Sequence, residues 1–177
     1  NWYHYIWLCA DHHVEQHVHN IDVCNWVMGA HPVKAWGMGD RQMLGDKPGE
    51  IWDNFAVQYD YANGVAMHSY SGQIKRDFSS VSEAVVGGKG TSNPAGSIKP
   101  TGGEAWRYRG KATPEYVQEH VDLINAIVGD KELNEVEQVT NSTLTAIMGR
   151  EAAYSGGVVE WDDMLNSKYA YGPELVY

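Results

Sequence analysis

The stretch that decides the fold is Phe55-Ala56-Val57-Gln58-Tyr59-Asp60-Tyr61-Ala62-Asn63-Gly64-Val65. Apolar and polar residues alternate from Ile51 to Tyr61, and a second alternating run extends from Val65 to Gln73. A period of two residues is typical of a β-strand with one buried face. Asn63-Gly64 between two such runs is the strongest short hairpin signal, because both turn positions need positive φ. The stretch therefore predicts an antiparallel hairpin.

Upstream of the hairpin, the spacing of apolar residues predicts a helix from His12 to Met28. Asp11 is the expected N-cap, and Gly29 is the expected C-terminal stop. A strand is expected from Val33 to Met43.

Downstream of the hairpin, short strands give way to helices. The turn Gly87-Gly88-Lys89-Gly90 is expected to join two of the strands. Thr113 is the expected cap of a helix with Pro114 at its first position, and Asn134 is the expected cap of another. The buried stripe predicted for that last helix is Val136, Val139, Thr143, Leu144, Ile147 and Met148.

This order of elements predicts an α+β fold. We expect an open, mostly antiparallel β-sheet with helices packed on one face, in a single domain over residues 1–177. The other face of the sheet is rich in Tyr, Met and Val and is available for oligomerisation. A homo-oligomer is therefore expected.

Composition excludes several classes of partner. The 177 residues are 43% hydrophobic and 20% charged, which is typical of a globular chain. A formal net charge of −10 argues against nucleic acid and anionic membranes, because phosphate binding needs clustered Lys and Arg. No apolar stretch reaches the roughly 18 residues that a membrane span requires. Two cysteines, Cys9 and Cys24, are too few for a disulfide scaffold.

Candidate chemistry is concentrated in the first helix, since six of the eight histidines precede Val33. In a continuous helix, four ionisable residues share about one stripe: His12, Glu15, His19 and Asp22. A carboxylate one turn before a histidine can orient the imidazole and raise its basicity. Such a pair could take a proton from a bound hydroxyl near neutral pH. The alternative is a polar helix face with solvated histidines.

Other chemistries find weaker support. His13 and His17 stand four residues apart and could chelate a metal ion from one helix face, but the order HExxH and any CxxC pair are absent. Neither GxGxxG after a strand nor GxxxxGK[ST] occurs, so no nucleotide site is visible and no cofactor is expected on this chain by itself. No metal site is assigned. The segment Trp106-Arg107-Tyr108-Arg109 could bind an anionic group through its arginines; the alternative is an exposed strand with outward-facing arginines.

At this point the residues resemble a known family. This chain has the segment Glu15-Gln16-His17-Val18-His19-Asn20-Ile21-Asp22, followed by Trp26 and Gly29. The segment resembles the catalytic helix of the glucose–fructose oxidoreductase / inositol dehydrogenase / MocA family, which usually has the motif D-x-G-x-H-x-x-D. Phe55 to Met67 resembles its central hairpin. Segments that resemble its strand-turn and closing helices follow in the same order: Val85 to Thr91, Tyr116 to Asp122 and Ser142 to Tyr154.

The resemblance implies a function for the chain. Members have a Rossmann domain that holds NAD or NADP and an α+β domain that holds a sugar or polyol, and this chain resembles only the second. His19 would be the acid/base that takes the hydroxyl proton, and Glu15, where Asp is usual, would orient the substrate or His19. Five residues would line the substrate pocket: His17, Asp22, His12, Trp7 and Arg107. We expect the isolated chain to be inactive, because hydride needs an acceptor.

Two alternatives remain open. The chain could be a standalone carbohydrate-binding or dimerisation module, or it could come from the members that cleave glycosides through transient oxidation by bound NAD. The presence of both Glu15 and His19 favours the oxidoreductase, since a scaffold has no use for that pair. The expected compartment is the cytoplasm, or the periplasm if an export signal precedes this sequence.

Overall fold

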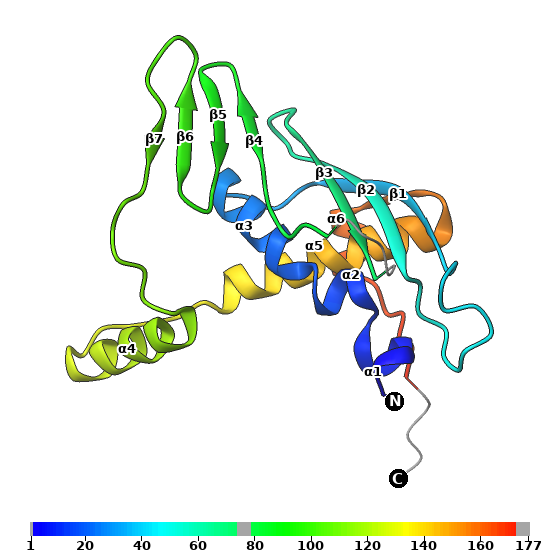
Figure 1. The fold of residues 1–177 in the computed structure, drawn as a ribbon. Coiled ribbons are helices and arrows are strands. Elements are labelled where there is room, and N and C mark those ends of the chain that lie inside the picture. Colours follow the sequence, from blue (N-terminus) through cyan, green and yellow to red (C-terminus); the bar gives the residue numbers. More distant parts are fainter. Residues whose placement is uncertain (1, 74–78, 173–177) are drawn as a thin grey trace. The chain divides into compact units, whose positions relative to one another are not determined.

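The chain divides into two compact units, each with its own antiparallel sheet. The computed structural model describes residues 2–73 and 79–172, and Figure 1 shows the order of their elements. One unit comprises residues 1–81 and 138–177, and the other comprises residues 82–137. The α+β class and the open, antiparallel sheet architecture are confirmed, but the strands form two four-stranded sheets where one was expected.

The sheet of the first unit has the strand order β3-β2-β1-β8. In that order the strands span Ala66–Gly72, Asn54–Asp60, Lys34–Asp40 and Val158–Glu160. Gly37 on β1 faces Val57 on β2, which in turn faces Ser69 on β3. The three long strands are therefore paired over seven residues each.

The predicted hairpin joins β2 and β3, but its turn differs from the expected two-residue type. Gly64 has a φ of +83°, whereas Asn63 is not among the residues with positive φ. The Gly64 and Tyr61 N–H groups donate to the Tyr61 and Val65 carbonyls at 2.9 and 2.8 Å. Such bonds close a three-residue loop with glycine in the left-handed position. The Asn63 side chain accepts a hydrogen bond from the Val65 N–H instead.

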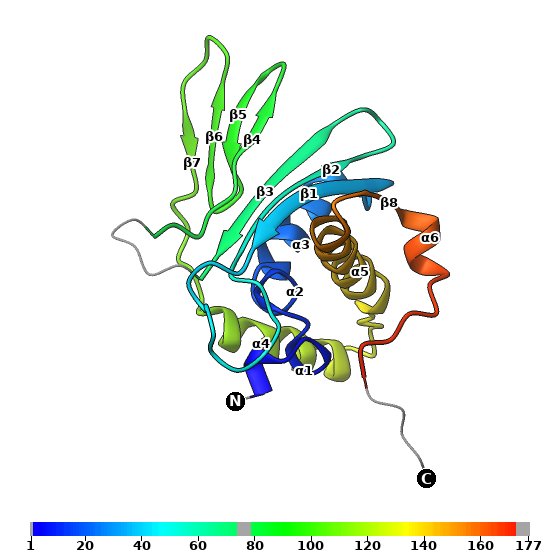
Figure 2. The ribbon, with the colours of Figure 1, turned by 90° about the vertical axis from the view of Figure 1, so that its right-hand side faces the viewer.

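Helices cover one face of this sheet, as Figures 1 and 2 show for α2, α3 and α5. The helices of the first unit are η1 (Trp2–His4), α1 (Ile6–Cys9), α2 (His12–Glu15), α3 (Val18–Met28), α5 (Val136–Ser155) and α6 (Trp161–Leu165). The inward residues of β2 are buried in one core with residues from α2, α3 and α5. This core contains Val14, Ile21, Phe55, Val57, Tyr59, Ala146 and Met148.

The single helix expected from His12 to Met28 is interrupted at Gln16 and His17. The His17 N–H donates to the carbonyl of His12, five residues back, at 3.1 Å. A bond of this kind inserts one extra residue into the turn, as in a π-bulge. An extra residue rotates the next helical segment by about 100°, so the expected continuous stripe is broken. The predicted helix ends are right: Asp11 caps α2, and Gly29 ends α3 with a φ of +62°.

The buried face of α5 was only partly predicted. Asn134 accepts a hydrogen bond from the Val136 N–H, as expected of a cap. Val136 and Val139 are exposed, however. Met148 is buried as predicted, but the other buried residues are small or polar: Ser142, Thr145, Ala146, Gly149, Arg150, Ala152 and Ala153. Small side chains allow the helix backbone to approach the sheet closely, which a search for large apolar residues misses.

The second unit contains a meander and one helix. Strands β4 (Val85–Gly87), β5 (Gly90–Asn93), β6 (Ser97–Pro100) and β7 (Trp106–Arg107) pair in sequence order. The expected turn over residues 87–90 joins β4 to β5. Helix α4 (Glu115–Val128) has no buried residue, and Pro114 with its extended ψ of 135° occupies the cap position. The expected cap, Thr113, is therefore one residue too early.

The face of the first sheet that the helices leave open carries large apolar side chains. Four of them are exposed on β1, β3 and β8: Trp36, Met38, Tyr70 and Val158. Trp36 pairs with Val158, and Met38 and Tyr70 both pair with Ala56 of β2, so the group extends across all four strands. Within the described residues, no helix has the length and apolarity that crossing a bilayer requires.

Candidate functional site

The candidate site is built around the start of α2. Ala10 and Asp11 both have positive φ, 60° and 72°, which is uncommon for residues other than glycine. The Asp11 carboxylate accepts hydrogen bonds from the His13 N–H and from the Tyr154 hydroxyl, both at 2.8 Å. Arg150 donates to the Ala10 carbonyl at 3.2 Å. The entry to α2 is therefore tied to α5, more than a hundred residues away.

Asp11 is fully buried, and burial raises its pKa to about 7. The hydrogen bonds from Tyr154 and His13 and the charge of Arg150 act in the opposite direction. A buried carboxylate at a helix start is stabilised by N–H donors, which here only partly offset its desolvation.

His13 is a fully buried histidine that anchors α2 to the sheet. Its Nδ1 lies 2.9 Å from the Ser71 hydroxyl and its Nε2 lies 2.8 Å from the Tyr59 hydroxyl. Its ring also packs against Phe55, with centroids 5.1 Å apart. Burial holds the pKa of His13 well below its ordinary value, so the ring is neutral. Sequence reasoning considered His13 only as a metal ligand, and its apolar neighbour Val14 was the only local sign of burial.

His17 is the second anchor, at the turn between α2 and α3. Its Nε2 lies 2.8 Å from the Ser69 hydroxyl on β3. The pKa of His17 is lowered to about 4, mainly because the ring is buried and in smaller part because His12 lies nearby. The rings of His13 and His17 are 5.3 Å apart. No group of three or more metal-ligating side chains converges anywhere in the described part of the chain, so these two histidines have no third ligand there.

His12 lies in a different polar cluster from His13. Its Nδ1 is 3.3 Å from the Tyr3 hydroxyl and 2.9 Å from the Gln73 amide nitrogen. Burial lowers the pKa of His12, while the charge of Glu15 acts to raise it. His12 and Glu15 are therefore electrostatically coupled, as expected for residues three positions apart on one helical turn.

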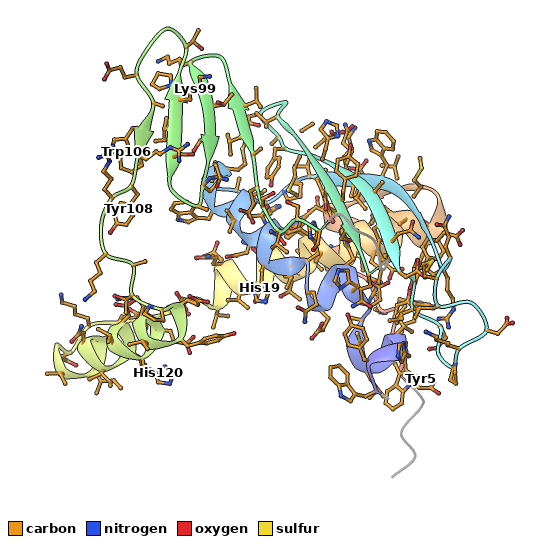
Figure 3. All side chains as sticks on the ribbon, in the orientation of Figure 1. Tyr5, His19, Lys99, Trp106, Tyr108 and His120 are labelled. Carbon is orange, nitrogen blue, oxygen red and sulfur yellow. The ribbon has the colours of Figure 1, made fainter. Side chains whose placement is uncertain are left out.

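Glu15 and His19 lie on opposite sides of the helix interruption. Glu15 is the last residue of α2, is half-buried, and accepts a hydrogen bond from the Gln16 side chain. His19 lies in the first turn of α3 and is exposed, as Figure 3 shows. With one residue inserted between them, the two residues are spaced like residues three apart in a regular helix, which are still neighbours on its surface.

Asp22, which was expected on the same stripe, faces α5. Its carboxylate accepts hydrogen bonds from the Ser142 hydroxyl at 2.6 Å and from the Gln138 amide at 3.1 Å. One turn further along α3, Asn25 is buried between Tyr61, which donates to it at 2.7 Å, and Thr145. These contacts hold α3 against α5, and Asn25 carried no signal in the sequence.

The two remaining candidate residues lie in separate units. Trp7 is 48% exposed on α1 in the first unit. Arg107 is exposed on β7 in the second unit. Trp7 lies in the same unit as α2 and α3, and Arg107 does not.

A cavity of about 370 Å³ lies elsewhere in the first unit, between α5, β8 and α6. It is lined by Leu144, Ile147, Arg150, Glu151, Val159, Asp163, Met164, Ser167, Tyr169 and Tyr171. Arg150 lies over the Tyr171 ring at 4.8 Å and pairs with Glu151 at 2.6 Å, so its charge is already balanced. None of the candidate site residues named from the sequence is among the residues that line this cavity.

Comparisons with known proteins show the fold. No family profile matches the chain, and no curated protein matches its sequence. A structure of scyllo-inositol dehydrogenase from Lactobacillus casei, with bound NAD(H) and scyllo-inositol, matches 86% of this chain with a TM-score of 0.66 and 20% identity. The structure of myo-inositol 2-dehydrogenase from Lactobacillus plantarum matches 85% of this chain, with a TM-score of 0.65 and 20% identity.

A third solved structure shares the same architecture. The aldose-aldose oxidoreductase of Caulobacter crescentus, complexed with glycerol, matches 90% of this chain at a TM-score of 0.67 and 18% identity. The chain spans about half the length of these proteins, 48% to 50%. The resemblance stated from the sequence motifs is thus confirmed at the level of architecture. This chain has the fold of the C-terminal half of inositol dehydrogenases and related sugar oxidoreductases.

Proposed function

We propose that this chain is the substrate-binding domain of an NAD(P)-dependent oxidoreductase that acts on a sugar, a polyol or a related hydroxy compound. The observation that carries the proposal is the position of Glu15 and His19, on either side of the α2–α3 turn. They lie in a fold shared with a dehydrogenase that was solved with NAD(H) and scyllo-inositol.

The proposed chemistry is the movement of one proton. An imidazole can accept and release a proton near neutral pH, and the exposed ring of His19 is open to a bound hydroxyl. Glu15 would orient that hydroxyl through its carboxylate oxygens. The buried contacts of His13 and His17 with the sheet support this arrangement, because they fix the two short helices that carry the pair.

The other expected residues would contact the substrate or hold the pair. His12 and Trp7 would contribute a ring nitrogen and a ring face. His17 and Asp22 already have partners in Ser69 and Ser142, which favours a supporting contribution from these two residues.

The described residues do not fit a dinucleotide. Dinucleotides bind at the crevice of a parallel βαβ sheet. All strand pairs that the structure describes are antiparallel. The hydride acceptor would therefore be held by residues outside the described part of this chain.

We also propose that the open face of the first sheet joins copies of this chain. The exposed group of Trp36, Met38, Tyr70 and Val158 supports this, because large exposed apolar patches mark interaction surfaces.

The test begins with the intact mass of the polypeptide from its native source. A polypeptide longer by a Rossmann half, on the order of 120 residues, is expected to reduce NAD or NADP with a polyol. In it, His19→Ala is expected to lower turnover about 10²- to 10⁴-fold, because general acid–base catalysis contributes a factor of that size. His120→Ala is the matched control, since His120 is an exposed histidine of α4.

The 177-residue chain provides the second arm. It is expected to bind polyols without NAD-dependent turnover. Turnover by the pure chain would contradict the proposed division of labour. Polyol binding by a native polypeptide of 19.7 kDa without any turnover would instead identify a carbohydrate-binding module.

A further inference from the structure

Three segments meet at a polar cluster that no expectation from the sequence included. Tyr3 comes from η1, His12 opens α2, and Gln73 directly follows β3. The Gln73 amide nitrogen contacts both the Tyr3 hydroxyl and the Nδ1 atom of His12. The Tyr3 hydroxyl also lies 3.3 Å from the same Nδ1 atom. Each of these three side chains therefore contacts the other two.

The Gln73 side chain favours one position for the proton of His12. Its amide nitrogen can only donate, and this nitrogen lies 2.9 Å from Nδ1 of His12. In this orientation of the amide, Nδ1 is the acceptor of the ring, with the Tyr3 hydroxyl as a second neighbour at 3.3 Å. A neutral imidazole carries one proton, which is then on Nε2. The cluster thus selects the tautomer that offers an N–H donor from Nε2.

The backbone holds Tyr3 in place through the loop between β1 and β2. The Glu50 and Ile51 N–H groups donate to the His4 carbonyl at 2.9 and 3.5 Å. Gly49 has a φ of +106°, and a Cβ atom there would lie only 2.0 Å from the His4 carbonyl oxygen. The loop therefore packs directly on the residue that follows Tyr3.

The same loop is itself well braced. The buried Asp53 carboxylate accepts hydrogen bonds from the N–H groups of three consecutive residues, Gln42, Met43 and Leu44. Arg41 donates to the Lys47 carbonyl at 2.6 Å and to the Ile51 carbonyl at 2.9 Å. The loop that contacts the backbone next to Tyr3 is therefore itself held by hydrogen bonds.

We propose that Tyr3 and Gln73 are positioning residues that hold His12 with its proton on Nε2. The Nε2–H group of His12 would donate to a neutral hydroxyl of the substrate, and the Glu15 carboxylate would accept from the same hydroxyl. A hydroxyl both donates and accepts, and this pair matches it. A phosphate or carboxylate would meet the negative charge of Glu15 and a neutral ring. The tautomer of His12 is inferred from the geometry of the cluster, whereas the role of His12 toward a substrate hydroxyl rests on the proposed function.

The first test measures His12 in the full 177-residue chain by long-range proton–nitrogen NMR of the histidine side chains. We expect His12 at neutral pH to carry its proton on Nε2. In Tyr3→Phe/Gln73→Ala, loss of the donors to Nδ1 is expected to raise the His12 titration midpoint by about half a pH unit or more. Tyr116→Phe removes a hydroxyl that is exposed on α4 and is expected to leave this midpoint unchanged.

The titration also reads other charges near His12, so their contribution must stay constant. Glu15 acts on His12, and His12 in turn acts on His13 and His17. The signal of His120, an exposed histidine of α4 in the second unit, therefore serves as the internal reference in each variant. A proton on Nδ1 in the wild type, or an unchanged His12 midpoint in the double variant, would overturn the positioning role.

The second test titrates the chain with scyllo-inositol and, separately, with myo-inositol 1-phosphate. We expect scyllo-inositol to shift the Nε2 signal of His12 and to bind about fivefold more weakly to Tyr3→Phe, the loss that one net hydrogen bond causes. Binding that is unchanged in Tyr3→Phe, or tighter binding of the phosphate, would overturn the role toward a neutral hydroxyl. Absence of any polyol binding by the wild type would instead contradict the proposed function, and the first test would still decide the tautomer.

Discussion

At the residue scale, the closest contact between α5 and the sheet depends on a glycine. A Cβ atom at Gly149 would lie 1.8 Å from the Tyr59 hydroxyl oxygen and 3.0 Å from Nε2 of His13. The hydroxyl and the imidazole are bonded to each other at 2.8 Å and are both fully buried. Gly149 therefore provides the space in which the anchor of α2 forms.

We predict that Gly149→Ala lowers the free energy of unfolding by about 1 to 3 kcal/mol, the usual cost of overpacking a core. The substitution would displace the Tyr59 hydroxyl and leave a buried ring nitrogen of His13 without its partner. Urea unfolding measures the loss. Gly157→Ala is the control, because a Cβ atom there meets only the Ser155 hydroxyl at 3.6 Å. Equal stabilities of the two variants would show that α5 can move away from the sheet without cost.

At the element scale, α2 and the turn after it make stability depend on pH. Burial lowers the folded-state pKa of His13 and His17, whereas an unfolded histidine titrates near 6.5. Below pH 6.5 the unfolded chain therefore binds protons that the folded chain does not, and stability falls. Asp11 acts in the opposite direction between pH 7 and about 4, because its folded-state pKa is raised to about 7. Since two histidines oppose one carboxyl group, we expect a net loss of stability on acidification.

The variant His17→Asn isolates one of these contributions. We predict that the slope of unfolding free energy against pH between 5 and 6 becomes smaller by at most about 1.4 kcal/mol per pH unit. Solvent screening at this partly exposed ring makes the change smaller than that upper value. The amide of asparagine retains a group that can bond the Ser69 hydroxyl. Denaturant unfolding at several pH values checks the slope, with His120→Asn on exposed α4 as the control. The prediction is wrong if both variants keep the wild-type slope.

At the scale of the whole molecule, the open face of the first sheet is the surface suited to a second copy. Figure 2 shows the helices on the opposite side of this sheet. The chain has a net charge of −10, so association through a charged surface would be opposed by like charges. An apolar surface across the four strands of this sheet avoids that repulsion.

We predict that Met38→Lys/Tyr70→Lys shifts the chain toward the monomer, because two charges would be buried in the apolar interface without partners. Sedimentation over a concentration series measures the shift. Met43→Lys changes an exposed methionine in the β1–β2 loop and is expected to leave the association state unchanged. A wild-type chain that sediments as a monomer at about 100 µM would contradict the proposed interface, because a specific dimer is far tighter than that.

Sequence reasoning found the elements of the candidate site but not its packing. The ends of α2 and α3 followed from Asp11 and Gly29, since capping depends on a few neighbouring residues. The bulge at Gln16 and His17 did not follow, because no local signal announces it; there His17 contacts the Ser69 hydroxyl, 52 residues away. One inserted residue was enough to interrupt the helix between Glu15 and His19.

The sequence by itself determined the hairpin, the order of strands and helices and the α+β class, because alternation and turn residues act within a few positions. Only the tertiary structure decided which histidines are buried, which side chains surround Nδ1 of His12, and that the strands divide into two sheets. His13 meets Tyr59 across 46 residues, and Asp11 meets Tyr154 across 143. Desolvation and hydrogen bonding depend on which groups surround a side chain in space, and no local pattern of residues contains that information.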